Sequence, residues 1–85
     1  MAIRYSTRFL RLYKKLPIQV KLLAEKKVDV LSENPFDTRL KTHKLSGPLE
    51  DCWAFWINHN YRIIFAFVEK DKIILLSVGD HSIYR

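Results

Sequence analysis

The sequence predicts a single α+β domain, in which a short strand and a hairpin of two helices precede a meander of three strands. Apolar residues recur at helical spacing in the first part of the chain, whereas a strand-like pattern begins at Cys52. The chain has 85 residues, of which 48% are hydrophobic, so it can bury one small core. We therefore expect one domain spanning residues 1–85, without a linker or an internal repeat.

The first strand and helix are predicted from apolar spacing and from a capping residue. Residues 3–5 alternate apolar and polar side chains and predict a short strand. Ser6 or Thr7 can cap the helix that follows, because a hydroxyl oxygen accepts hydrogen bonds from the free N–H groups at a helix start. The buried stripe of this helix is expected to comprise Phe9, Leu12, Tyr13 and Leu16.

A second helix is predicted after Pro17, which breaks the first helix and suits the first position of another. We expect it to end near Ser32, since Asn34 precedes a proline and avoids helical geometry. Two helices joined at a proline form an antiparallel hairpin that can cover one face of a sheet.

Three apolar segments after a basic connector, residues 35–48, predict the meander. They are residues 52–57, 61–68 and 73–78. Alternation places Trp53 and Phe55 on one side of the sheet and Trp56 on the other. Because both sides are apolar, we expect the side without helices to be a pocket wall or a surface for a partner.

The formal charge of +6 lies wholly in the first quarter of the chain. Residues 1–24 contain six basic residues and no acidic one, whereas basic and acidic residues balance in the remainder. Such an excess favours a polyanionic partner, either nucleic acid or an acidic protein. The alternative is a solvated helix face that serves only solubility.

Cysteine usage and hydropathy predict a cytoplasmic protein without a membrane partner. The single cysteine, Cys52, excludes an internal disulfide and is typical of a reducing compartment. No long apolar run follows the first residues, so we expect no signal peptide. No apolar stretch is long enough to span a bilayer.

Residues 79–85, directly after the last predicted strand, carry several reactive groups. His81 can exchange a proton near neutral pH, Tyr84 can donate a hydrogen bond or stack, and Arg85 can bind a phosphate. These groups predict a site at the rim of the sheet.

The order of the elements and several short motifs together resemble the RelE/ParE superfamily of bacterial type II toxins. The motifs are KKLP at 14–17, ENPF at 33–36, RLKTHKLSG at 39–47, NYRIIF at 60–65 and VGDH at 78–81, with Arg8, Phe9, Trp53, Tyr84 and Arg85. Each motif is short, but their order and spacing are specific to the superfamily.

The resemblance implies a RelE-like fold of order β-α-α-β-β-β, with an N-terminal strand and a two-helix hairpin packed on one face of a twisted antiparallel sheet. It implies an endoribonuclease that cleaves messenger RNA, usually on the ribosome, and that needs neither a metal nor another cofactor. It also implies an antitoxin partner, encoded by a neighbouring gene, that neutralises the toxin.

Cleaving RNA through its 2′-OH without a metal needs a base, an acid and a cation for the phosphate. Arg62 begins an apolar strand and matches the strand arginine of the superfamily, so it predicts the phosphate contact. The alternative is a structural ion pair with Glu50, Asp51 or Asp80.

His43, His81 and Tyr84 are the candidates for proton transfer. Lys41 and Lys44 flank His43 and favour a neutral imidazole, which is the form that a general base needs. His81, with Tyr84, matches a tail position where some members of the superfamily carry a catalytic histidine. The alternatives are that His43 is a solvated loop histidine, that His81 is a surface histidine, and that Tyr84 is an aromatic residue packed in the tail.

The remaining basic residues predict contacts with RNA phosphates. They are Arg39, Lys41 and Lys44 in the connector, Arg85 in the tail, and Arg8, Arg11 and Lys15 on the first helix. Cys52 and the three histidines lack metal-ligand spacing, so we expect no metal site. Trp53, Phe55 and Trp56 are expected in the core or in an antitoxin groove rather than under a nucleobase, and His59 is expected to have no chemical role.

One position departs from the superfamily pattern. RelE-type nucleases often carry a basic residue near the position of Trp56. Its loss weakens charge stabilisation by about 2–4 kcal/mol unless another group, such as His59 or Arg39, replaces it. Two alternatives to a nuclease therefore stay open: a ParE-like inhibitor of DNA gyrase, and a degenerate member that only binds its antitoxin.

Overall fold

The computed structural model describes residues 1–80 and confirms the predicted α+β class. In chain order, the elements of this part are β1 (Ala2–Tyr5), α1 (Thr7–Tyr13), α2 (Ile18–Glu33), the 3₁₀-helix η1 (Thr38–Leu40), β2 (His43–Lys44), the 3₁₀-helix η2 (Gly47–Leu49), β3 (Trp53–Trp56), β4 (Arg62–Glu69) and β5 (Lys72–Gly79).

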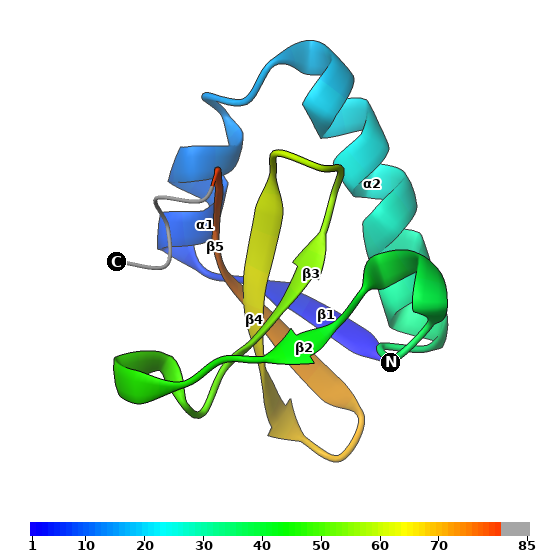
Figure 1. Cartoon of the computed structure of the whole chain (residues 1–85), viewed down its shortest axis with the longest axis vertical. Coiled ribbons are helices and arrows are strands. Elements are labelled where there is room, and N and C mark those ends of the chain that lie inside the picture. The colour runs from blue at the N-terminus through cyan, green and yellow to red at the C-terminus, as the bar shows by residue number, and fades with distance from the viewer. Residues whose placement is uncertain (81–85) are drawn as a thin grey trace.

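The strands form one sheet in the order β1-β5-β4-β3-β2 (Figure 1). The predicted meander is present as β3, β4 and β5, and β2 adds an antiparallel edge to it. The pairing of β1 with β5 is parallel, so the sheet is mixed rather than wholly antiparallel. A parallel pair is possible here because a long connection, which includes both helices, separates the two strands.

The helix boundaries follow the capping and breaking residues closely. Ser6 caps α1, since its Oγ accepts a hydrogen bond of 3.0 Å from the backbone N–H of Phe9. α1 ends at Tyr13, and Leu16 enters the core from the turn that follows rather than from the helix. α2 begins after Pro17 and ends at Glu33, one residue beyond the expected end.

The hydrophobic core lies between the helix hairpin and one face of the sheet. Its buried members are Phe9, Leu16, Val20, Ala24, Leu31, Leu40, Phe55, Ile57, Ile63, Phe65, Ile73, Leu75 and Val78. Burial of these side chains is the main favourable term in folding a domain of this size. Figure 1 shows α1 beside β5, and the turn that follows it leads across the top of the view to α2.

The face of the sheet away from the helices, here called the distal face, carries the alternate residues of the strands. They are Ala54, Trp56, Arg62, Ile64 and Ser77, which are cross-strand partners or neighbours in register. The predicted alternation in the first meander strand is therefore correct. The distal face is where the sheet can present polar groups without disturbing the core.

The basic connector contains more structure than the sequence predicts. η1 and η2 flank β2, whose His43 and Lys44 pair with Ala54 and Trp53 of β3. Lys41 lies between η1 and β2 in the left-handed region, at φ 53°, which costs a residue other than glycine about 1 kcal/mol. Among residues 1–80, no helix has the length and the apolar character needed to cross a membrane.

The Ser6 cap leads to a stability prediction. Ser6→Ala removes the acceptor for the N–H of Phe9 and the donor to the carbonyl of Leu76, so it should lower the free energy of unfolding by about 1 kcal/mol. Urea unfolding followed by circular dichroism measures this change. Thr7→Ala, one residue along, is the matched control and should change stability by less than about 0.5 kcal/mol; an equal loss in both variants would contradict the cap.

Candidate functional site

Arg62 is a buried cation on the distal face. It is the first residue of β4 and is only 4% exposed. Its Nη1 donates to the backbone carbonyls of Asn58 at 2.7 Å, His59 at 2.9 Å and Tyr61 at 3.2 Å. The turn between β3 and β4 therefore surrounds one end of the guanidinium with backbone oxygens.

The partners of Arg62 within residues 1–80 are neutral. The ion pairs in this part of the chain are Arg39 with Asp37 and Lys72 with Glu69, and neither includes Arg62. The structural ion pair that the sequence offered as an alternative is thus absent from this part of the chain. Burying a charge without an opposite charge is costly, so this guanidinium favours an anion as a ligand.

The indole ring of Trp56 contacts two cations, Arg62 and Lys41. It pairs with Arg62 across the β3–β4 ladder, and Cζ of Arg62 lies 3.9 Å from the centre of the indole ring. Nζ of Lys41 lies 5.0 Å from the same centre. Both are cation–π contacts. Near position 56, where the superfamily often has a basic residue, the structure therefore places Lys41, and the ring of His59 also contacts Trp56.

His43 faces the same side of the sheet. It pairs with Ala54, and its Nδ1 lies 3.0 Å from the carbonyl oxygen of Lys41. Because a carbonyl oxygen can only accept, this contact is a hydrogen bond when Nδ1 carries the proton, and in that tautomer of the neutral ring the lone pair is on Nε2. His43 also lines a hollow of about 300 Å³ with Leu45, Ser46 and Leu49. This is the protonation pattern that a general base requires.

Only β3 separates His43 from Arg62 on the distal face. Two strand spacings and a shift of two residues give a Cα–Cα separation of roughly 12 Å. An arginine and an imidazole at this separation can contact the same nucleotide. The structure therefore brings together Arg62, Lys41 and His43 of the predicted site residues.

Other predicted RNA-binding residues lie elsewhere. Arg8, Arg11 and Lys15 are exposed on and just after α1, in the helix layer, so the sheet separates them from Arg62. Lys44 pairs with Trp53 and lies on the helix side of β2. His81, Tyr84 and Arg85 lie outside the described residues.

Arg39 is bound to a neighbouring carboxylate. Its Nε and Nη2 donate to the two carboxylate oxygens of Asp37 at 3.0 and 2.9 Å. The hydrogen bonds from the side chain and from the backbone N–H of Arg39 lower the pKa of Asp37 to about 2. A phosphate would have to compete with this carboxylate for the guanidinium of Arg39.

Two aromatic side chains near the turn contact each other. The rings of Trp56 and His59 meet edge to face with centroids 5.8 Å apart, while the sequence placed Trp56 in the core or an antitoxin groove and gave His59 no chemical role. The spacing of the turn could have revealed the contact between Trp56 and Arg62, because a hairpin centred on His59 places these two residues opposite each other. Ser77, also on this face, has a buried Oγ without a hydrogen-bond partner in the described part of the chain.

No group of three His, Cys, Asp or Glu side chains in residues 1–80 is arranged to hold a metal ion. Cys52 is half-buried, and burial, with a smaller contribution from Asp51, raises the pKa of its thiol. The thiol is therefore protonated at neutral pH and is a poor nucleophile.

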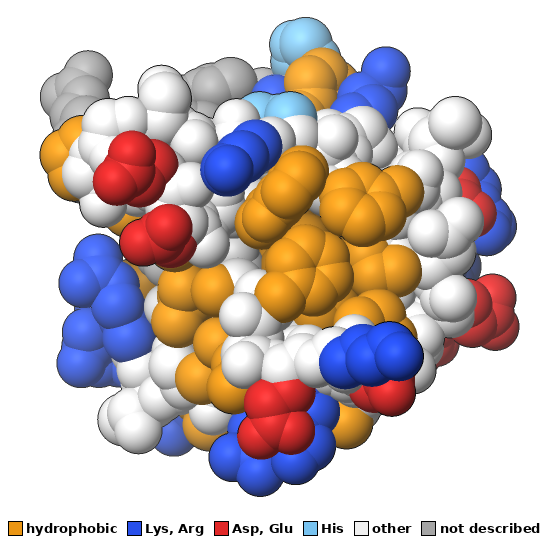
Figure 2. All heavy atoms as spheres, turned by 90° about the horizontal axis from the view of Figure 1, so that it is seen from below, with side chains coloured by type: hydrophobic (Ala, Val, Ile, Leu, Met, Phe, Trp, Pro, Cys, Tyr) orange, Lys and Arg blue, Asp and Glu red, His pale blue; other side chains and the backbone are white. Residues whose placement is uncertain are grey.

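An exposed aromatic patch surrounds Trp53, which pairs with Lys44 and therefore faces the other side of the sheet from Arg62. Trp53 contacts Phe36 and Phe67 with ring centroids 5.2 and 6.0 Å apart. Phe36 is 55% exposed and Phe67 is 37% exposed. Figure 2 shows apolar side chains gathered into one patch on the side of the molecule seen there. Such a patch on a small domain is typical of a surface that a partner covers.

Solved structures of bacterial toxins share this fold. A YoeB/ParE toxin from Agrobacterium tumefaciens superposes with a TM-score of 0.79 at 13% identity, over 95% of this chain and 99% of that one. YafQ from E. coli strain BL21(DE3) superposes with a TM-score of 0.80 at 16% identity, over 95% of this chain and 93% of YafQ. A chain of the toxin–antitoxin complex RelBE2 from Mycobacterium tuberculosis superposes with a TM-score of 0.78 at 21% identity, over 94% of this chain and 96% of that one.

The chain therefore has the fold of the RelE/ParE toxins, as the sequence motifs predicted. No model of a protein family matches the sequence, and no curated protein sequence matches it either. The sequence identities are low, so the shared feature is the arrangement of helices and strands around the distal face.

The pair of Asp37 and Arg39 leads to a prediction about pH. Because the pKa of Asp37 is lowered to about 2, its contribution to stability is fully present above the ordinary value of 3.8 and is lost as the pH falls towards 2. Arg39→Met removes the side-chain donors, which are the largest cause of the shift, but keeps the backbone N–H, so the pKa of Asp37 should rise towards its ordinary value without reaching it, and this acid-dependent loss should shrink. Carboxyl-carbon NMR between pH 5 and 2 measures the titration; an unchanged midpoint in the variant would contradict the pairing.

The contact between Trp56 and Arg62 can be measured by a double-mutant cycle. Trp56→Leu, Arg62→Met and the double variant should give a coupling free energy of about 1 kcal/mol in urea unfolding, because the guanidinium is buried on the indole ring. The matched cycle, with Trp56→Leu and Lys41→Met, should give a smaller coupling free energy, since Lys41 is exposed and lies farther from the ring. Equal coupling in both cycles would contradict a special position for Arg62.

Proposed function

We propose that this chain is the toxin of a type II toxin–antitoxin system and that it acts as an endoribonuclease on messenger RNA. The observation that carries the proposal is the Arg62 guanidinium, which is buried, bound by carbonyl oxygens and stacked on Trp56, with no carboxylate as an ion-pair partner in residues 1–80. A phosphate supplies the missing opposite charge.

The reaction is attack by a ribose 2′-oxygen on the adjacent phosphorus. Nε2 of His43 accepts the 2′-OH proton, the bond from 2′-oxygen to phosphorus forms, and the bond from phosphorus to the 5′-oxygen breaks. Arg62, supported by Lys41, stabilises the negative charge that develops on the phosphate. The leaving 5′-oxygen takes a proton from an acid, for which the sequence offers His81 with Tyr84. The products are a 2′,3′-cyclic phosphate and a 5′-hydroxyl.

The toxin acts in the bacterial cytoplasm on ribosome-bound message and is held inactive by an antitoxin. Two observations support a protein partner: the exposed aromatic patch around Trp53, and the solved structures that share the fold, which include the RelBE2 complex and a YoeB–YefM complex from Staphylococcus aureus. The net charge of +6 supports both an RNA substrate and an acidic partner.

The test of the proposal compares variants of the two central residues. Arg62→Lys and His43→Gln should each lower the cleavage rate by about 10²–10³-fold, since each removes one transition-state contact. Growth arrest and message decay after induction in bacteria are the readouts, with circular dichroism to establish that each variant folds. Fragments with 2′,3′-cyclic or 3′-phosphate ends are expected; ends with a 3′-hydroxyl would reject this route.

Lys44→Gln is the matched control for His43→Gln, because the two residues are adjacent in β2 and face opposite sides of the sheet. We expect less than a tenfold effect from it. Supercoiling assays with purified DNA gyrase distinguish the ParE-like alternative, and normal growth of cells that express the folded chain alone would favour a degenerate member.

A further inference from the structure

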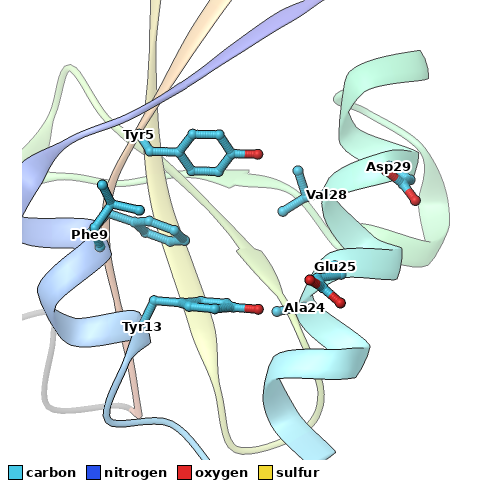
Figure 3. A pocket seen from close by; sticks show the side chains of 8 residues that line it. Tyr5, Phe9, Tyr13, Ala24, Glu25, Val28 and Asp29 are labelled. Atoms are coloured by element: carbon cyan, nitrogen blue, oxygen red, sulfur yellow. The ribbon is translucent and has the colours of Figure 1, made fainter. Parts of the chain in front are cut away.

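A cavity of about 550 Å³ lies between the two helices, remote from the distal face. One wall is formed by Tyr5 of β1 with Phe9 and Tyr13 of α1, and the other by Glu25, Val28 and Asp29 of α2. Figure 3 shows the two tyrosine side chains extending from β1 and α1 towards α2, with their hydroxyl groups nearest to it. The cavity plays no part in the reaction proposed above.

The first wall is a ladder of three aromatic rings. The centroids of Tyr5 and Phe9 are 5.8 Å apart, and those of Phe9 and Tyr13 are also 5.8 Å apart. Phe9 is buried in the core, so the ladder is anchored, whereas Tyr5 is 49% exposed. The Tyr5 and Phe9 rings are tilted by 41°, and the Phe9 and Tyr13 rings are stacked at 29°. The outer ring faces of the two tyrosines, which line the cavity, can attract a cation.

The second wall is negatively charged. Glu25 and Asp29 are four residues apart on α2 and therefore share one side of the helix. Neither forms an ion pair within residues 1–80. The hydroxyl of Tyr13 donates to the carbonyl of Lys21, and burial, together with Glu25, raises the pKa of this phenol, so Tyr13 stays uncharged. The one cation beside this ladder that the described contacts reveal is Lys21, at 5.9 Å from the centre of the Tyr13 ring.

The geometry points to a binding site for the basic side chain of a partner protein, an arginine or lysine flanked by apolar residues. The aromatic faces and the two carboxylates both favour a cation, and the exposed Leu10 beside them offers contact to apolar neighbours. The partner is the antitoxin, an identification that rests on the proposed function, whereas the preference for a cation does not.

A site for one basic side chain would fix the position of an otherwise acidic partner on this basic chain. On a chain with a net charge of +6, an acidic partner is attracted to many positions and is held in no particular register. A cavity with two carboxylates repels acidic side chains and accepts a basic one. One basic residue of the partner seated there would therefore fix its position on the helix hairpin.

The cavity is tested directly with two peptides, acetyl-Leu-Arg-Leu-amide and its neutral isostere acetyl-Leu-citrulline-Leu-amide. Titration of the ¹⁵N-labelled chain should shift amide signals around Tyr5, Tyr13 and Glu25, and the arginine peptide should bind about tenfold more tightly. Equal affinity of the two peptides, or shifts confined to another surface, would overturn the site. RNA cleavage is not involved, so this result stands apart from the nuclease test.

Variants then identify the side chains and the partner. Glu25→Gln with Asp29→Asn should abolish the preference for arginine, while Glu33→Gln, at the end of the same helix, should leave it unchanged. The double variant should also bind the antitoxin at least tenfold more weakly, as measured by calorimetry. Unchanged antitoxin affinity would overturn the assignment of the partner, and a loss of self-association in sedimentation would assign the cavity to a second copy instead.

Discussion

The parallel pairing of β1 with β5 determines how the other elements can be arranged. Ile3 pairs with Ile73 and Tyr5 with Leu75, so the chain begins at one edge of the sheet, beside its last strand. The helices that follow must leave this edge and cover one face, where Phe9 joins the core. The meander then closes the sheet from the other side, and its distal face keeps Trp56 and Arg62 apart from the helices.

This separation gives the two layers opposite chemistry. On the distal face, Arg62 and Lys41 meet at one indole ring, and the partners of Arg62 in residues 1–80 are backbone oxygens and that ring. Between the helices, two carboxylates and two phenols line a cavity. A substrate rich in phosphate and a basic side chain of a partner would therefore be directed to different sides of the same small domain, although the chain as a whole is basic.

Arg62 shows how local structure can hold a charge that has no ion-pair partner among the described residues 1–80. Residues 58–61 direct three carbonyl groups at Nη1, and the guanidinium carbon lies 3.9 Å from the centre of the Trp56 ring. These contacts fix the orientation of the group, while no carboxylate within residues 1–80 neutralises its positive charge. Preorganised charge of this kind is the form in which an enzyme stabilises a developing negative charge most effectively.

Much of the fold could be predicted from local signals. Ser6, Pro17 and Asn34 set the helix ends because capping and proline geometry act within a few residues, and the alternation in β3 placed Phe55 and Trp56 on opposite faces. The parallel edge pairing and the small strand β2 were missed because both depend on partners distant in sequence. Tertiary contacts of this kind have no local pattern.

The sequence by itself determined the class of the domain, its helix hairpin and meander, and the residue types available for binding a phosphate, because propensity and periodicity are local properties. Only the tertiary structure decided which of those residues meet. It placed Lys41 rather than Arg39 at Trp56, put the cations of α1 in the other layer, and formed the cavity between Tyr5 and Glu25. These outcomes depend on strand register and helix packing, which bring together side chains far apart in the chain.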